Sequence, residues 1–128
     1  MSNNAVCWFE IPATDMNRAK AFYEAVFDLE INVQDFQGTQ MGWFPPTNNE
    51  TSGISGSLIQ HEAYVPSETH GVLIYFESDD IEATLKKVKA NGGKVIQEKT
   101  EISPDVGSMG VFVDTEGNRI SLYTNAQD

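Results

Sequence analysis

The pattern of apolar and polar residues in this chain occurs twice, and the second copy begins 65 residues after the first. Phe9-Glu10-Ile11 corresponds to Ile74-Tyr75-Phe76, and in each copy this strand pattern runs into an aspartate, Asp15 or Asp80. Self-similarity at a fixed period dictates the fold, because each copy is one supersecondary unit. The sequence therefore predicts two small modules that close on each other, with any ligand site between them.

The first copy predicts a strand, a helix and three further strands. Residues 5–11 form the strand, which ends at Pro12. Asp15 then caps a helix over 16–27, since its carboxylate can accept the free amide hydrogens of the first turn. The helix carries one apolar stripe at three- and four-residue spacing: Ala19, Phe22, Tyr23, Val26 and Phe27. Three extended segments complete the module, at 30–34, 40–44 and 54–60.

The second copy repeats this order. A strand over 71–77 leads to Asp80, which caps a helix over 81–91. Gly92-Gly93 ends that helix, because glycine adopts the left-handed conformation at no steric cost. Three more strands follow, at 94–100, 107–114 and 119–124. The predicted fold class is α+β, with a βαβββ module at about 5–60, a polar connection at 61–70 and a second βαβββ module at about 71–124, all in one domain of 1–128.

The side chains of a strand alternate between its two faces, so each strand divides into two sets. One set is apolar and suits the face that the helices cover: Cys7, Phe9, Ile11, Ile74, Phe76, Ile120 and Leu122. Cys7 is accordingly expected to be a buried, inert thiol. The other set mixes polar groups with large aromatic rings, as in a ligand cleft: Trp8, Glu10, Gly56, Leu58, Gln60, Leu73, Tyr75, Glu77, Ser121 and Tyr123. The alternative for this second face is a surface that meets only water or a dimer partner.

Charge and cysteine content narrow the range of partners. The net charge of −11 argues against nucleic acid, whose phosphates need a basic surface, and against anionic membranes. The same charge favours cationic ligands. No apolar stretch approaches the roughly 20 residues that span a bilayer. The single cysteine cannot form an internal disulfide, so a reducing, cytoplasmic location is expected.

Three segments resemble the vicinal oxygen chelate superfamily, the group of glyoxalases, bleomycin-resistance proteins and extradiol dioxygenases. They run from Phe9 to Tyr23, from Tyr75 to Ile81 and from Phe112 to Ile120. The resemblance implies tandem βαβββ modules in a cupped, eight-stranded mixed sheet with the helices on its outer face. It also implies a homodimer, because members of the superfamily commonly form dimers.

In the metal-dependent members, four strand residues inside the cup, typically His and Glu, hold one divalent ion that acts as a Lewis acid. The corresponding positions in this chain hold Trp8, Leu73, Ser121 and a residue near Gly56. None of these side chains is a good metal ligand, so we predict that the usual metal site is absent and that no cofactor is bound. The alternative is a displaced metal site, with candidates Glu10, Gln60, His61, Glu62, His70 and Glu77.

The predicted function is that of a glyoxalase/bleomycin-resistance-like protein that binds a cationic or aromatic small molecule in its inner cleft. The predicted ligand-binding residues are Trp8, Glu10, Leu58, Gln60, Leu73, Tyr75, Ser121 and Tyr123. Trp8 and Tyr123 would stack on a flat ligand. The segments 45–53 and 61–70 are expected to line the entrance of the cleft.

Three alternatives remain open. One is a metal-dependent lyase, isomerase or dioxygenase with displaced ligands. Another is a metal-free acid–base enzyme, with Glu10 as the general base and Tyr75 or Tyr123 as the proton donor. The last is a regulatory or scaffolding protein that uses its dimer surface. Glu10 also has a plainer interpretation, as a surface carboxylate or the structural hydrogen-bond partner of a tyrosine.

Overall fold

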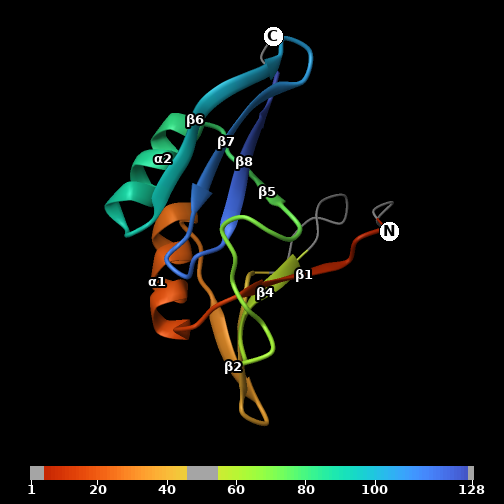
Figure 1. The fold of residues 1–128 in the computed structure, drawn as a ribbon, viewed down its shortest axis with the longest axis vertical. Helices are drawn as coiled ribbons and strands as arrows, with labels where there is room; N and C mark the ends of the chain where they lie inside the picture. The colour runs from red at the N-terminus through yellow and green to blue at the C-terminus, as the bar shows by residue number, and fades with distance from the viewer. Residues whose placement is uncertain (1–4, 46–54, 127–128) are drawn as a thin grey trace.

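The structure, a computed structural model, describes residues 5–45 and 55–126 (Figure 1). Module one consists of β1 (Trp8–Pro12), α1 (Met16–Phe27), β2 (Asn32–Phe36), β3 (Thr39–Trp43) and β4 (Ser55–Gln60). Module two consists of β5 (Ile74–Glu77), α2 (Ile81–Ala90), β6 (Lys94–Ser103), β7 (Gly107–Val113) and β8 (Arg119–Asn125). The predicted order βαβββ is confirmed in both modules. Of the predicted loop 45–53, all but Pro45 lies outside the described residues.

Each module forms its own four-stranded mixed sheet. The strand orders are β1-β4-β3-β2 and β5-β8-β7-β6. In both sheets the first and fourth strands are parallel, and the other neighbours are antiparallel. The predicted α+β class of two tandem modules is thus confirmed, with the eight strands divided between two sheets. Figure 1 shows both helices on the same side of these sheets, and α1 and α2 are in contact with each other.

Both helices begin where their aspartate caps predict. The Asp15 carboxylate accepts a hydrogen bond from the Arg18 amide at 3.1 Å, and Asp80 accepts one from the Ala83 amide at 3.1 Å. A cap of this kind stabilises a helix by about 1 kcal/mol. At the end of α2, Gly92 has a φ of 96°, which only glycine adopts without strain. Neither described helix is long and apolar enough to cross a membrane.

The two modules share one hydrophobic core, which lies between the helices and the sheets. Phe76 of module two is in ring contact with four aromatic residues of module one, at centroid distances of 4.6 to 6.1 Å: Phe9, Tyr23, Phe27 and Phe44. Tyr23 is fully buried at the centre of this cluster. Aromatic pairs in such tilted and edge-on arrangements contribute beyond the area they bury. The sequence repeat therefore folds as two modules around a common interior.

The turn between β7 and β8 connects module two to the start of α1 by hydrogen bonds. Glu116 in this turn accepts hydrogen bonds from the backbone amides of Thr14 at 2.7 Å and Asp15 at 2.8 Å. Its other carboxylate oxygen accepts a hydrogen bond from Arg18 Nε at 2.7 Å. The Glu116 side chain is fully buried, which by itself would raise its pKa. The hydrogen bonds from Arg18, Asp15 and Thr14 outweigh that effect and lower the pKa to about 2.

Asp114 makes a second connection from the same turn. Its carboxylate accepts hydrogen bonds from the Tyr23 hydroxyl at 2.6 Å and from the Asn118 backbone amide at 2.9 Å. The Asn118 side-chain amide donates to the backbone oxygen of Pro12 at 2.7 Å. Burial raises the pKa of Asp114 despite these donors. The turn thus contacts β1 and α1 through buried polar groups that are all paired.

Cys7 is exposed, and its assignment to the helix-covered face is wrong. β1 begins at Trp8, so Cys7 precedes the strand. The alternation of side chains holds only within a paired strand, and it gives no orientation for a residue outside one.

Candidate functional site

The register between strands defines which residues face away from the helices. In the parallel pair β1–β4, Glu10 lies opposite Ser57, and Ile11 lies opposite Leu58. Ile11 and Leu58 belong to the core, with 1% and 0% of their surface exposed. Since neighbouring residues alternate, Glu10 and Ser57 lie on the other face of the sheet. We call the face of each sheet that is turned away from the helices its open face.

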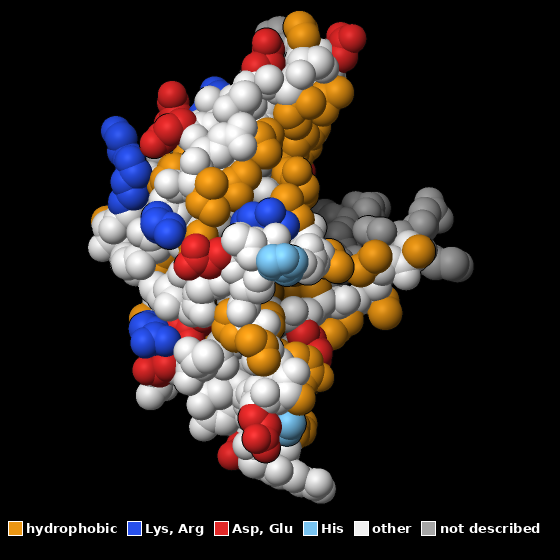
Figure 2. Space-filling view, in the orientation of Figure 1, with side chains coloured by type: hydrophobic (Ala, Val, Ile, Leu, Met, Phe, Trp, Pro, Cys, Tyr) orange, Lys and Arg blue, Asp and Glu red, His pale blue; other side chains and the backbone are white. Residues whose placement is uncertain are grey.

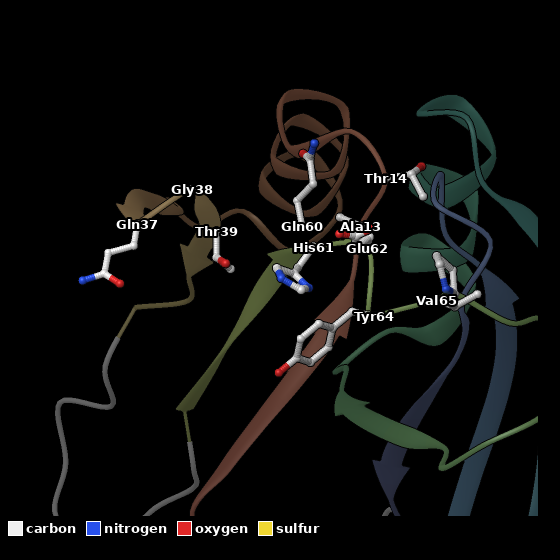
Figure 3. Close-up of a pocket in the computed structure, with 11 residues that line it drawn as sticks. Ala13, Thr14, Gln37, Gly38, Thr39, Gln60, His61, Glu62, Tyr64 and Val65 are labelled. Carbon is white, nitrogen blue, oxygen red and sulfur yellow. The ribbon is translucent and has the colours of Figure 1, made fainter.

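The assignment of Gly56, Leu58 and Gln60 to the open face is wrong. Leu58 is in the core, and Gly56 packs so closely on Phe9 that an added Cβ would lie 2.5 Å from Phe9 Cγ. The Gln60 side-chain oxygen accepts a hydrogen bond from the Met16 amide at 2.7 Å, and Figure 3 shows this side chain extending toward α1.

The physical cause is a one-residue change in the offset of the repeat. Glu10 and Tyr75 are 65 positions apart, but their strand partners Ser57 and Ser121 are only 64 apart. A shift of one residue moves every side chain of a strand to the opposite face. The open-face counterpart of Ser121 is therefore Ser57 rather than Gly56.

In module two, the predicted faces agree with the register. Tyr75 lies opposite Ser121, and Glu77 lies opposite Tyr123, while the residues between them enter the core. Ser121 is fully buried and Tyr75 is 51% exposed. Arg119 stands two residues before Ser121 in β8 and so shares the open face. Arg119 is not among the residues predicted from the sequence, although its place in the strand determines its face.

A cavity of about 530 Å³ lies between the modules. One wall is β1, and the other consists of the segment that precedes β5 together with the start of β8. The predicted residues Trp8, Glu10 and Leu73 line this inter-module cavity. The connection contributes Val65, Ser67 and His70 to its lining. Figure 2 shows hydrophobic side chains along the side of the molecule away from the helices, while Lys and Arg gather mainly over the helices.

Two opposite charges, Glu10 and Arg119, line the inter-module cavity without pairing. The ion pairs of the described residues involve Arg18, Lys20, Lys89 and Lys94. Among the described residues, neither the Glu10 carboxylate nor the Arg119 guanidinium takes part in a side-chain hydrogen bond, and Arg119 Nε is buried without a partner. Unsatisfied charged groups at a cavity wall are available to a ligand.

An aromatic row extends the site along the open face of module one. The rings of Trp8 and Trp43 meet edge to face with centroids 5.7 Å apart, and Phe36 stacks on Trp43 at 6.1 Å. Their exposed fractions are 37%, 40% and 48% for Trp8, Trp43 and Phe36. Trp8 is among the predicted residues, but Phe36 and Trp43 are not, because the sequence pattern assigned no face to the second and third strands.

A second cavity, of about 620 Å³, lies at the C-terminal ends of β1 and β4 (Figure 3). Gln60, His61 and Tyr64 line it, and the rings of His61 and Tyr64 are in edge contact at 5.9 Å. Gln60 thus lines a different cavity from Glu10. The described residues contain no group of three or more His, Cys, Asp or Glu side chains placed to hold a metal ion. The candidates for a displaced metal site are not brought together in this part of the chain.

The two tyrosines proposed as proton donors do not line the inter-module cavity. The Tyr123 hydroxyl donates a hydrogen bond to the Val106 backbone oxygen at 2.6 Å. Tyr75 lies on the open face of module two and contributes to neither cavity described above. No hydrogen bond between a tyrosine and Glu10 is present in the described residues, so the geometry gives no support to an acid–base pair.

The residues at the four positions of the usual metal site do not form a donor set. With Ser57 in place of Gly56, these positions hold Trp8, Ser57, Leu73 and Ser121. The hydroxyls of Ser57 and Ser121 are buried without a hydrogen-bond partner in the described structure. Divalent transition metals require imidazole, thiolate or carboxylate ligands, and none of the four side chains supplies one. The residues present do not fit a metal at this place.

Sequence comparison finds one family along nearly the whole chain. The model of the Glyoxalase/Bleomycin resistance protein/Dioxygenase superfamily matches residues 6–122. A glyoxylase-like domain-containing protein from Didymella fabae is 33% identical over 119 residues, which cover 90% of this chain and 89% of that protein. Protein CFP32 of Mycobacterium bovis is 32% identical over 93% of this chain, which spans only 43% of CFP32.

Solved structures agree with this chain in fold. A mutant of glyoxalase I from Zea mays superposes with a TM-score of 0.75 at 15% identity, covering 98% of this chain and 48% of that one. The antibiotic binding protein TnmS3 from Streptomyces sp. CB03234 superposes with a TM-score of 0.68 at 23% identity, covering 98% and 99% of the two chains. At these identities the structural likeness shows the fold alone.

Proposed function

Because this chain belongs to the Glyoxalase/Bleomycin resistance protein/Dioxygenase superfamily, we propose that it binds a small organic molecule in the inter-module cavity, without the superfamily's usual metal. The observation that carries the proposal is the place of Glu10. Glu10 lines a largely apolar cavity beside Trp8, and its carboxylate has no ion-pair partner in the described residues. We expect the ligand to supply a cationic group and an aromatic or apolar body.

The chemistry of the cavity supports a ligand of this kind. A partly buried charge without a partner is unfavourable, because it has lost water and gained no compensating interaction. A cationic group on the ligand restores that interaction, and a cation over a tryptophan ring adds about 0.5–2 kcal/mol. The net charge of −11 attracts cations toward the protein. A volume of about 530 Å³ is suitable for a small organic molecule.

One structural neighbour supports binding, while the curated relatives include glyoxylase-like proteins and a biosynthesis protein. TnmS3 is an antibiotic binding protein, and DnrV of Streptomyces peucetius, 26% identical over 129 residues, is an anthracycline biosynthesis protein. This chain spans only 46% of DnrV. The proposal that the chain lacks the usual metal rests on the side chains of Trp8, Leu73, Ser57 and Ser121, because none of them is a good metal ligand.

Binding of 2-phenylethylamine, a phenyl ring with one ammonium group, tests the proposal. Isothermal titration calorimetry of the full chain should detect binding, and both Glu10→Gln and Trp8→Ala should weaken it at least tenfold. Glu82→Gln, on the helix side, removes the same charge and should leave the affinity unchanged. Equal affinity in Glu10→Gln would contradict the proposed site. Near-stoichiometric Zn²⁺, Ni²⁺, Mn²⁺ or Fe²⁺ in elemental analysis of untagged protein would contradict the metal-free part.

We also propose that the chain forms a homodimer through its open faces. Phe36, Trp43 and Tyr75 are each at least 40% exposed on these faces. Exposed aromatic side chains gathered on one face are typical of interaction surfaces. Light scattering coupled to size-exclusion chromatography should give twice the chain mass of 14.2 kDa. A monomer at micromolar concentration would contradict this part alone.

A further inference from the structure

We infer that the ligand of the inter-module cavity is a zwitterion, with an ammonium group bound by Glu10 and a carboxylate bound by Arg119. This inference rests on the proposed function and adds the second charge of the ligand. It comes from the side of the cavity that belongs to module two, where Arg119 is placed.

The position of Arg119 is fixed by its backbone. Arg119 is the first residue of β8 and pairs across the sheet with Val113. Its backbone amide donates a hydrogen bond to the Ser67 oxygen at 3.2 Å, which joins β8 to the connection between the modules. Both Ser67 and Arg119 line the inter-module cavity. The backbone of Arg119, from which the guanidinium extends, is therefore held by Val113 on one side and by Ser67 on the other.

The guanidinium of Arg119 lacks the partners that the other arginine of the chain has. Arg18 donates from Nε to Glu116 at 2.7 Å and from a terminal nitrogen to the same carboxylate at 3.1 Å. Arg119 Nε is buried with no hydrogen-bond partner in the described residues. A buried donor left unpaired is unfavourable, because it has lost its water and gained no partner. A planar carboxylate can accept two parallel hydrogen bonds from a guanidinium, and the terminal nitrogens of Arg119 have no ion-pair partner among the described residues.

The combination of charges decides the class of ligand. A ligand with only a positive charge would pair with Glu10 and leave Arg119 unpaired in the same cavity. A ligand with only a negative charge would leave Glu10 unpaired. A molecule with both charges can pair with both Glu10 and Arg119. Its apolar part can lie against Trp8, Val72 and Leu73. The chemical class is a small amino acid or related zwitterion with an aromatic or aliphatic group.

Three probes that share one phenyl ring test the inference by calorimetry: phenylalanine, 2-phenylethylamine and 3-phenylpropionate. Phenylalanine should bind the wild-type protein at least tenfold more tightly than either singly charged probe. Arg119→Met should lower the affinity for phenylalanine to that for 2-phenylethylamine, without weakening 2-phenylethylamine itself. Arg119→Lys keeps the charge but loses the planar fork, so it should retain only part of the preference. Lys89→Met removes a positive charge from α2 and should change nothing.

The outcomes separate this inference from the proposed function. Thermal unfolding checks first that each variant is folded. If 2-phenylethylamine binds as tightly as phenylalanine, and Arg119→Met has no effect, the zwitterion is contradicted while a cation site at Glu10 stands. If phenylalanine is preferred but the preference survives Arg119→Met, the role of Arg119 is contradicted. If none of the three probes binds at millimolar concentration, both the inference and the proposed cation site fail.

Discussion

Arg18 on α1 and Glu116 in the turn between β7 and β8 form an ion pair, with 2.7 Å between Nε and Oε2, although 98 residues separate them in the sequence. The pair joins the two modules. Glu116 is fully buried, whereas half of the Arg18 side chain remains exposed. The carboxylate also accepts two backbone amides, so it is held mainly by donors that cannot move away.

Glu116→Gln should make the protein less dependent on pH in the acid range. The pKa of Glu116 is about 2 in the folded chain and 4.5 in the reference state. The ionised carboxylate therefore stabilises the fold fully above pH 4.5, and this contribution is lost as pH falls through about 2. Linkage gives about 3 kcal/mol for such a shift. Urea unfolding from pH 7 to pH 2 should show a difference between wild type and variant that shrinks with acidification. A difference independent of pH would contradict this origin.

Tyr23→Phe should destabilise the protein by about 1–3 kcal/mol, because it removes a buried donor from a buried carboxylate. The Tyr23 hydroxyl donates to Asp114 at 2.6 Å. The pKa of Asp114 is already raised by burial, and losing this donor raises it further. The variant should therefore lose more stability at pH 7 than at pH 4, because the missing hydrogen bond stabilises the ionised form of Asp114. Tyr64→Phe, at an exposed ring, serves as the control in urea unfolding.

Leu58→Ala and Ser57→Ala, at adjacent positions of β4, should have opposite consequences. Leu58 is in the core, so its truncation should cost about 2–5 kcal/mol. The Ser57 hydroxyl is buried without a partner, so its removal should be neutral or stabilising by a few tenths of a kcal/mol. Denaturant titration of both variants checks this. A larger loss of stability in Ser57→Ala than in Leu58→Ala would contradict this assignment, because it would place Ser57 in the core and Leu58 on the open face.

Gly56→Ala should disrupt module one. An added methyl group would overlap the backbone oxygen of Phe9 and lie 2.5 Å from Phe9 Cγ, and the parallel pairing of β1 and β4 leaves no room for either to move. We expect a loss of about 3 kcal/mol or more. Gly38→Ala is the matched control, since an added Cβ there meets nothing within 4 Å and only the φ of 92° is unfavourable. That control should lose about 1 kcal/mol. Similar unfolding midpoints for the two variants would contradict the steric cause.

The elements of this fold could be predicted because their signals are local. Asp15 and Asp80 act on amides three residues away, and Gly92 ends its helix through its own backbone angle. Strand existence was similarly readable from alternation. Cys7 shows the limit of that rule, since the strand begins one residue later.

The site could be predicted only in part, because register depends on partners distant in the sequence. The fixed offset and the alternation of faces selected Trp8, Glu10 and Leu73, and all three line the inter-module cavity. It failed at Leu58, since nothing near that residue reveals that the register of β4 against β1 differs by one residue from the register of β8 against β5. Arg119 and Glu116 are close in sequence, yet one lines the cavity and the other binds α1. Their roles are set by what lies across the module boundary.

The residues that hold the two modules together are largely different from the residues that line the inter-module cavity. Glu116, Tyr23 and Phe76 hold the modules together on the helix side, while Trp8, Glu10 and Arg119 face the cavity. Substitutions at the cavity therefore leave most of the folding free energy untouched. Such a separation makes a scaffold evolvable: the recognition residues can diverge through many neutral intermediates, and ligand preference can change between relatives faster than architecture. Directed evolution of new binders from this chain would begin at those three positions.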